Sequence, residues 1–319
     1  TRFLANELFG GYGLVILDAN DSGLKQLFVP YIKQELLKQT SFKAVSQTIT
    51  EFPNEYKVQV NPREINLFYI TKGVRERIVY ENEVYKVNNT DISWVKEALL
   101  KHLYEVPERF SPNVLLRPLY QEVVLPNLCY IGGGGELAYW FEIKEMFAAF
   151  NVSFPILLLR NSALIIKEAQ QEKLTKLKLP ISELFLKQTD LLAQKTKELS
   201  KLNIDFSTKK EFLKEQFNEL YEIAKQTDAS FTGAVAAQEK KQLNGLSNLE
   251  KRLLKAEKRK LKEKLNSFTT LQNELFPRQS LQERNTNFSD LYLEFGKELI
   301  PMLKKELKPL NDEFIVIIL

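Results

Sequence analysis

Short runs of apolar, β-branched residues predict buried strands in the first half of the chain. One run, residues 14–18, ends in an Asp-Ala-Asn-Asp loop, as the carboxyl end of a buried parallel strand does. Two further runs, residues 128–131 and 154–159, enclose four glycines and a helix-like segment that extends to about Phe150. Strand, turn, helix and strand in this order predict a βαβ unit with parallel strands and a right-handed crossover.

Alternating apolar and polar positions predict antiparallel hairpins between the first run and this unit. The alternation covers residues 56–60, 65–70 and 77–80, with polar turns between them. Helix-like patterns flank the hairpins, from about Ser22 to Lys38 and between Asp91 and Tyr104. The first half therefore predicts an α/β domain, residues 1–162, that is interrupted by hairpins at about residues 52–90 and is not doubly wound.

From about Leu164 the composition shifts to Lys, Glu, Leu and Gln, and apolar residues follow the four-three spacing of a coiled coil. The repeat comprises Leu213, Phe217, Leu220, Ala224, Thr227, Phe231 and Ala234, and then Leu246, Leu249, Leu253, Ala256, Leu261, Leu265 and Phe268. We expect an antiparallel pair of helices, each roughly 30 to 40 residues and therefore about 45 to 60 Å long. The polar stretch 238–245 does not fix where the chain reverses, and one continuous helix that crosses a partner is the alternative.

The second domain, residues 163–319, is thus expected to be mainly helical. Pro277 stops the repeat, and residues 314–319 form an apolar strand candidate. We expect this strand to return to the α/β core. The predicted fold class is α/β plus α.

Composition narrows the function classes. Hydrophobic residues make up 44% and charged residues 27%, and 45 basic against 41 acidic residues give a net charge of +4, so neither nucleic acid nor a membrane is expected as a partner. The single Cys129 and the single His102 exclude a disulfide framework, a thiolate zinc site and a multi-histidine metal site within one chain. No apolar run reaches the roughly 20 residues of a membrane helix and no signal peptide is recognisable. We therefore expect a cytoplasmic protein, and a start at Thr1 without Met suggests a fragment.

The glycine turn Gly132, Gly133, Gly134 and Gly135, followed by Glu136, is the first candidate site. Glycines between a strand and a helix let a ligand approach the backbone, and the helix N-terminus offers free N–H groups to an anion. The spacing is neither G-x-G-x-x-G nor a phosphate loop, so nicotinamide and P-loop readings find little support. A plain tight turn, with Glu136 favouring the helix dipole, explains the pattern equally well.

A second candidate precedes the turn, where Asn113, Arg117 and Gln121 are spaced by four. On one helical face they would offer a guanidinium fork and two amides to a carboxylate or to sugar hydroxyls. Pro112 and Pro118 argue against one regular helix, and a solvated surface is the alternative.

Three further residues complete the candidates. Tyr139 and Trp140 could wall a ligand, although core packing explains such a pair more often. Arg160 closes the third strand at its carboxyl end, where open α/β sheets bind ligands, with helix capping or an ion pair as the alternative.

Several blocks of the chain resemble the enzymes that add cysteine in bacillithiol biosynthesis. The signature block is residues 113–121 and 125–140, and three further blocks are residues 9–18, 61–69 and 281–284. The resemblance covers the whole chain, which corresponds to the carboxy-terminal three-fifths of that family. The family usually carries Gly-Gly-Pro-Gly-Glu at the turn, whereas Gly134 replaces the proline here, which loosens the loop without removing its amides.

The resemblance implies a partial Rossmann-like core with inserted segments, similar to class I aminoacyl-tRNA synthetases, and a coiled coil that supports a homodimer. It implies a ligase that joins the cysteine carboxyl group to the amine of glucosaminyl-malate, with adenylated cysteine as the expected intermediate. The resemblance leaves open whether ATP or ADP takes part in the reaction, and it assigns no catalytic residues. The alternative is a non-catalytic coiled-coil scaffold with a degenerate nucleotide-binding-like domain. The substrate contacts expected are Asn113, Arg117, Gln121, Gly132, Gly133, Gly134, Gly135, Glu136, Tyr139, Trp140 and Arg160.

Overall fold

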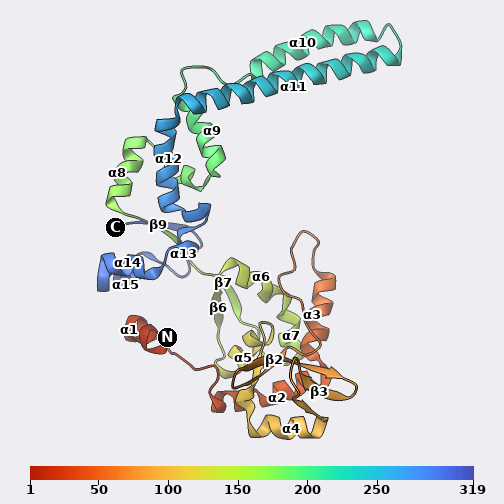
Figure 1. The fold of residues 1–319 in the computed structure, drawn as a ribbon, viewed down its shortest axis with the longest axis vertical. Helices are drawn as coiled ribbons and strands as arrows, with labels where there is room; N and C mark the ends of the chain where they lie inside the picture. The colour runs from red at the N-terminus through yellow and green to blue at the C-terminus, as the bar shows by residue number, and fades with distance from the viewer. The chain divides into compact units, whose positions relative to one another are not determined.

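The computed structural model describes all 319 residues and divides into two compact units (Figure 1). Unit 1 comprises residues 1–161 and 308–312, and unit 2 comprises residues 162–307 and 313–319. No helix is long and apolar enough to cross a bilayer.

Unit 1 contains a five-stranded antiparallel sheet with the order β4-β3-β2-β1-β5. The strands are β1 (Leu67–Thr71), β2 (Val74–Glu81), β3 (Val84–Val87), β4 (Ser93–Trp94) and β5 (Phe110–Pro112). The β2–β3 turn places Asn82 and Glu83 at positive φ, which matches the twist that a tight hairpin needs. The antiparallel strands expected at residues 65–70 and 77–80 are confirmed as β1 and β2.

The strand expected at residues 56–60 does not form. The backbone amides of Gln59 and Val60 donate instead to the buried carboxylate of Glu142, at 2.6 and 3.2 Å. The Glu142 side chain thus accepts the hydrogen bonds that these two amides would otherwise donate to a neighbouring strand.

The βαβ unit is confirmed. Strands β6 (Cys129–Gly132) and β7 (Ile156–Leu159) pair in parallel, with Gly132 opposite Leu159. Between them lie α6 (Gly134–Glu142) and α7 (Lys144–Ala149), since Ile143 leaves helical geometry and divides the single helix that we expected. The strand expected at residues 14–18 is absent: this segment has no regular secondary structure and belongs to no ladder, and Val15 is 70% exposed.

Helices around these sheets bury the core of unit 1. The expected helix at residues 22–38 is confirmed as α2, in which Asp21 caps the first turn by accepting a 3.0 Å hydrogen bond from Leu24 N. Its apolar stripe includes Phe28, Ile32 and Leu36, which join one cluster with Phe110 and Trp140. The remaining elements of unit 1 are α1 (Arg2–Phe9), η1 (Gly10–Tyr12), α2 (Ser22–Lys38), α3 (Thr40–Glu51), α4 (Lys96–Glu105), η2 (Pro107–Arg109) and α5 (Leu116–Val124).

Unit 2 is built on a two-stranded parallel sheet of β8 (Ser162–Ile166) and β9 (Phe314–Ile318). The terminal strand is therefore real, but our expectation that it returns to the α/β core is wrong, because its hydrogen-bond partner is β8 and its side chains Phe314 and Val316 pack in the core of unit 2. Gln282, in the sequence block 281–284, pairs with the backbone of Ile165 at 2.9 and 3.0 Å, so this block supports β8.

The helices of unit 2 are α8 (Glu168–Leu177), η3 (Ile181–Phe185), α9 (Gln188–Leu199), α10 (Ser207–Ala224), α11 (Ala229–Lys260), α12 (Lys262–Leu275), η4 (Pro277–Gln279), α13 (Gln282–Asn285), α14 (Phe288–Phe295), η5 (Gly296–Glu298) and α15 (Leu299–Glu306). Buried residues of α8, η3, α9 and α12 form one apolar cluster with Leu164 and Ile166 of β8, whereas α10 and α11 share a separate small cluster.

Helices α10 and α11 form the expected antiparallel pair and lie side by side (Figure 1). Lys210 pairs with Glu250 and the Tyr221 hydroxyl donates to Glu239, so the two contacts run in opposite directions along the two helices. The chain reverses at residues 225–228, where Asp228 caps α11. The repeat assigned through Thr227 is therefore interrupted, and α10 has 18 residues rather than the expected 30 to 40.

Candidate functional site

Arg117 lies between two adjoining cavities of unit 1, with volumes of about 250 and 280 Å³. Ala19, Arg117 and Tyr120 line both, and we call the two together the Arg117 cavity. The smaller part adds Asp18, Asn20, Lys25, Ile70, Arg75, Ser111 and Pro112. The larger part adds Leu17, Leu24, Gln121, Val124, Leu125 and Asn127. Of the predicted residues, the structure brings Arg117 and Gln121 together here.

Asn113 holds the start of the helix that carries Arg117. Its Oδ1 accepts hydrogen bonds from Leu115 N at 2.9 Å and Leu116 N at 3.3 Å, and its backbone oxygen accepts one from Arg117 N at 2.9 Å. Pro118 falls in the first turn of α5, where a missing N–H costs nothing. Pro112 and Pro118 therefore lie on either side of the helix start. The contacts of Asn113 with this helix are hydrogen bonds to backbone groups.

A buried polar network lies behind Asn113. The Glu35 carboxylate, fully buried, accepts hydrogen bonds from Ser41 N at 2.9 Å, Ser41 Oγ at 2.5 Å and Asn66 N at 3.1 Å. Asn66 Oδ1 in turn accepts from Asn113 Nδ2 at 2.8 Å. Burial raises the pKa of Glu35, which the four hydrogen bonds from Ser41 and Asn66 only partly oppose. Asn66 lies in the sequence block 61–69, whereas Glu35 was not among the candidates from the sequence.

Lys25 is the functional candidate that the sequence analysis missed. Its side chain is buried, its Nζ donates to the Phe110 carbonyl oxygen at 2.7 Å, and it lies 5.2 Å from the centre of the Tyr120 ring. Burial, and then the positive charge of Arg117, lower the pKa of Lys25 to about 8, with Glu108 acting in the opposite direction. The available signal was its position, because Lys25 occupies the apolar stripe of α2 together with Phe28.

Positive charge dominates the smaller part of the Arg117 cavity. Lys25, Arg75 and Arg117 line it against one carboxylate, Asp18, and none of the three cations forms an ion pair. Arg75 stacks on the Phe68 ring, 3.9 Å from its centre. Asp18 already accepts from Asn20 N at 3.0 Å and lies 3.6 Å from the Arg2 guanidinium. The arrangement can therefore hold an anion.

The glycine turn forms a separate feature at the carboxyl end of β6. A Cβ atom at Gly132 would lie 2.7 Å from Tyr130 Cε1 and 3.1 Å from Leu137 Cδ2, so this position requires glycine. Gly133 N donates to Glu136 Oε2 at 2.7 Å, which uses one amide that we expected to face a ligand. The amides of Gly134 and Gly135, at the first two positions of α6, have no acceptor within the helix.

An apolar cavity of about 670 Å³ adjoins this turn. We call it the glycine-turn cavity; its lining comprises Phe52, Pro53, Tyr56, Lys57, Gln59, Gly134, Leu137, Ala138, Phe141 and Leu159. Arg160 follows Leu159, its backbone N donates to Gly132 O at 2.9 Å, and its side chain is exposed. Trp140 instead packs in the core, 1% exposed and stacked on Tyr130 at 4.1 Å, while Tyr139 is half-buried.

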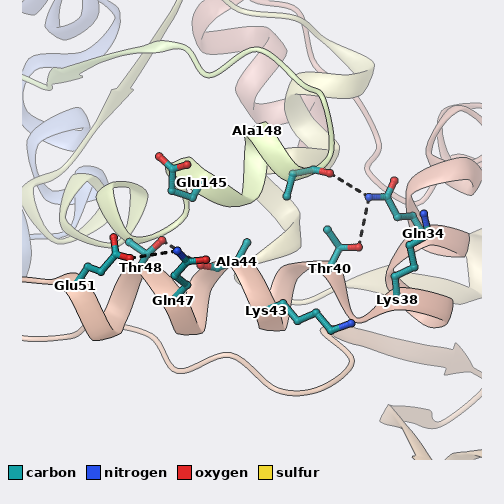
Figure 2. A pocket seen from close by; sticks show the side chains of 11 residues that line it. Gln34, Lys38, Thr40, Lys43, Ala44, Gln47, Thr48, Glu51, Glu145 and Ala148 are labelled. Carbon is teal, nitrogen blue, oxygen red and sulfur yellow. Dashed lines mark hydrogen bonds between the residues drawn. The ribbon is translucent and has the colours of Figure 1, made fainter.

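A third hollow, of about 680 Å³, lies along α3 and α7 (Figure 2). At one end of it, Gln34 Nε2 donates to Ala149 O at 3.1 Å and to Thr40 Oγ1 at 3.4 Å. Lys38 and Lys43 lie toward one end and Glu51 toward the other (Figure 2). None of the predicted site residues lines it, and its charged side chains are exposed, so the Arg117 cavity is the stronger candidate.

Two family models match the chain. "Bacillithiol biosynthesis BshC, N-terminal Rossmann-like domain" matches residues 1–161, and "Bacillithiol biosynthesis BshC, C-terminal coiled-coil domain" matches residues 163–319. The boundary between the two matches coincides with the boundary between the two compact units near residue 161, although residues 308–312 of the second match belong to unit 1.

Curated relatives agree with these models. Proteins named "Putative cysteine ligase BshC" are 57% identical over 317 residues in Flavobacterium johnsoniae and 59% identical over 317 residues in Flavobacterium psychrophilum, with 99% of this chain and 60% of each relative covered. A relative with the same name in Lysinibacillus sphaericus is 26% identical over 324 residues, which cover 95% of this chain and 58% of the relative. The chain thus spans about three-fifths of the length of these relatives.

Proposed function

The chain belongs to the BshC family of bacillithiol biosynthesis, and from this membership we propose that it takes part in the ligation of cysteine to glucosaminyl-malate. The bond formed is the amide between the cysteine carboxyl group and the glucosamine amine. Cysteine must stay reduced for the product to serve as a thiol, so we place the reaction in the cytoplasm.

The cationic Arg117 cavity is the observation that carries this proposal. Glucosaminyl-malate is an anionic sugar conjugate, and a guanidinium fork recognises carboxylates in a fixed geometry. Arg117 and Gln121 both line this cavity, and the capping by Asn113 supports their placement. We therefore assign substrate contact to Arg117 and Gln121 and a positioning role to Asn113.

The glycine turn and Arg160 are proposed to contact the activated partner. Amide formation from a carboxylate needs a leaving group, and attack of the cysteine carboxylate on the α-phosphorus of ATP would release pyrophosphate and form an acyl adenylate. The neutral sugar amine then attacks the carbonyl carbon of this adenylate, which releases AMP and a proton. The amides of Gly134 and Gly135, at the carboxyl end of β6, suit an anionic group at this place.

The α10–α11 hairpin favours a second function, assembly. Phe212, Ile223 and Phe231 are 61%, 54% and 44% exposed, so apolar surface remains along both helices after they pair. Such surface is typical of an interaction site. We propose a homodimer through this hairpin; the alternative of a scaffold without catalysis predicts the same dimer but no response to substrate.

A chimera tests the ligase proposal. This chain would replace the matching 317 residues of the Flavobacterium johnsoniae relative, and bacillithiol formation from cysteine, glucosaminyl-malate and ATP would be followed by mass spectrometry. We expect product, and at least a tenfold loss of rate in Arg117→Ala, because about 1.4 kcal/mol or more of transition-state binding is removed.

The unmodified relative and the chimera with Lys38→Ala serve as controls, since Lys38 lies on α2 outside the Arg117 cavity. An active relative beside an inactive, folded chimera would contradict the ligase proposal. The melting temperature of the isolated chain, measured with and without glucosaminyl-malate, distinguishes the ligase proposal from the scaffold alternative. The ligand should raise the melting temperature of a ligase and should leave that of a scaffold unchanged.

A further inference from the structure

Lys25 is a buried cation without an ion-pair partner. Its side chain is 2% exposed, and its single hydrogen bond goes to the Phe110 carbonyl oxygen. An ammonium group carries three donors, so two remain for another partner. Burial of a charged lysine is unfavourable unless an anion or further acceptors compensate it, and Lys25 lines a cavity of about 250 Å³.

The charges around Lys25 come from four neighbouring segments. Arg117 on α5 and Arg75 on β2 are positive, whereas Asp18 before α2 and Glu108 in η2 are negative. Asp18 is engaged by Asn20 N and lies near Arg2, and Glu108 has the smallest of the three effects on Lys25. Tyr120 supplies a ring face and donates its hydroxyl to Ala19 O at 3.1 Å, so it adds no charge. Three cations thus face the smaller cavity with one carboxylate that already has partners.

The size of the smaller cavity suits a group rather than a whole substrate. Ligand pockets usually span about 300 to 1,000 Å³, and this part has about 250 Å³. The adjoining part of about 280 Å³ shares Arg117 and Tyr120 and is lined by Gln121 and Asn127, whose amides suit hydroxyl groups. An anionic group in the smaller part would therefore leave room for a sugar in the larger part.

We propose that Lys25, Arg75 and Arg117 form an oxyanion-binding pocket that takes a carboxylate of the malyl group of the substrate, with Lys25 as its buried member. This assignment rests on the proposed function for the identity of the substrate. The chemistry recognised is a planar or tetrahedral oxyanion, which a carboxylate or a phosphate can supply.

Anion binding must then be linked to protonation of Lys25. An anion beside Nζ favours the ammonium form, so it raises the pKa of Lys25 from about 8. Near pH 8 about half of the free molecules would gain a proton on binding, whereas near pH 6 Lys25 is already charged and takes up none. Affinity should accordingly be highest below pH 8 and fall as the pH rises through it.

Calorimetry with L-malate on the whole chain tests this linkage. Titrations at pH 8 in two buffers with different ionisation enthalpies give the number of protons taken up. We expect roughly half a proton at pH 8 and none at pH 6. Lys25→Arg should bind malate without proton uptake, because arginine stays charged, and Lys25→Met should weaken binding at least tenfold.

Matched controls keep the test interpretable. Lys38→Met changes an exposed lysine of the same helix and should leave affinity and proton uptake unchanged. Circular dichroism confirms the fold of each variant, and Lys25→Arg provides the decisive comparison if Lys25→Met unfolds.

Four results would overturn the proposal. Malate affinity unchanged in Lys25→Met would remove Lys25 from the pocket, and equal proton uptake in Lys25→Arg would assign the proton elsewhere. Binding of inorganic phosphate, with Lys25-dependent uptake, in place of malate would replace the malyl assignment with a phosphoryl group. Bacillithiol formation by the chimera without malate binding would leave the proposed function intact and reject this pocket alone.

Discussion

The Asn113 side-chain amide donates a 2.8 Å hydrogen bond to Oδ1 of Asn66, and the Asn113 backbone N donates at 3.0 Å to the Asn66 carbonyl oxygen. This double link joins the start of α5 to the network around Glu35. Arg117 therefore lies on a helix whose first turn is held in place by hydrogen bonds to buried polar groups. Stability and ligand affinity should be coupled through this pair.

Replacement of Asn113 by alanine should lower the free energy of unfolding by about 1 to 2 kcal/mol, since α5 loses its capping acceptor and Asn66 loses a donor. Urea unfolding followed by circular dichroism measures this change. Asn54→Ala, at an exposed loop position, is the matched control and should change stability by less than about 0.5 kcal/mol. Equal effects in the two variants would argue against the capping role.

Glu35 should make stability depend on pH. Its folded-state pKa is raised by burial, so protonation favours the folded state; this stabilisation is complete below the unfolded pKa and is lost as the pH rises through the folded pKa. The wild-type chain should gain stability on acidification toward pH 4.5, the ordinary pKa of a glutamate. Glu35→Gln should lack this gain and, because its amide N–H₂ group faces donors, should cost about 1 to 3 kcal/mol. A pH profile identical to that of the wild type would contradict the assignment.

The glycine turn offers a matched pair of substitutions. Gly132→Ala places a methyl group 2.7 Å from Tyr130 Cε1 and should destabilise unit 1 by about 1 to 3 kcal/mol. Gly135→Ala meets nothing within 4 Å and lies in α6, so it should be neutral or stabilise by up to about 1 kcal/mol. Thermal unfolding of both variants measures these changes in stability. A larger loss of stability in Gly135→Ala than in Gly132→Ala would contradict the packing described at Gly132.

Phe217 should hold the hairpin together locally. It is 6% exposed and shares a small cluster with Ala224 and Val235, so Phe217→Ala should cost about 3 kcal/mol within α10 and α11. Hydrogen exchange of the amides of α10 should accelerate, while that of unit 1 should stay unchanged. Phe212→Ala, at a position 61% exposed, should leave exchange in α10 nearly unaltered.

Local patterns predicted the elements whose stability is local. The hairpins of the antiparallel sheet, the βαβ unit and helix α2 all follow from periodicity and turn residues. Residues 14–18 and 56–60 have strand-like patterns as well, but a strand needs a neighbouring ladder, and none pairs with the first while Glu142 occupies the amides of the second. The reversal at residues 225–228 was missed because Thr227 fits the heptad spacing while lying in the turn.

Only part of the candidate site could likewise be predicted from local sequence patterns. The spacing of Arg117 and Gln121 predicted that they share a face, and both line one cavity. Lys25 could not be selected from the sequence, because a lysine counts as a surface residue until the packing of α2 shows that it is buried. Asp18 and Lys25 lie far from Arg75 and from Arg117 along the chain, and only the tertiary fold brings these residues together.

The pairing of β8 with β9 also has a consequence for folding. Ser162 lies opposite Phe314, so two neighbouring strands are separated by about 150 residues of sequence, and the entropy of closing this loop must be overcome before their contacts stabilise unit 2. At typical synthesis rates, roughly 7 to 30 s pass between the translation of the two strands. During this interval Leu164, Ile165 and Ile166 have no partner strand, so β8 is where nascent chains should first associate wrongly.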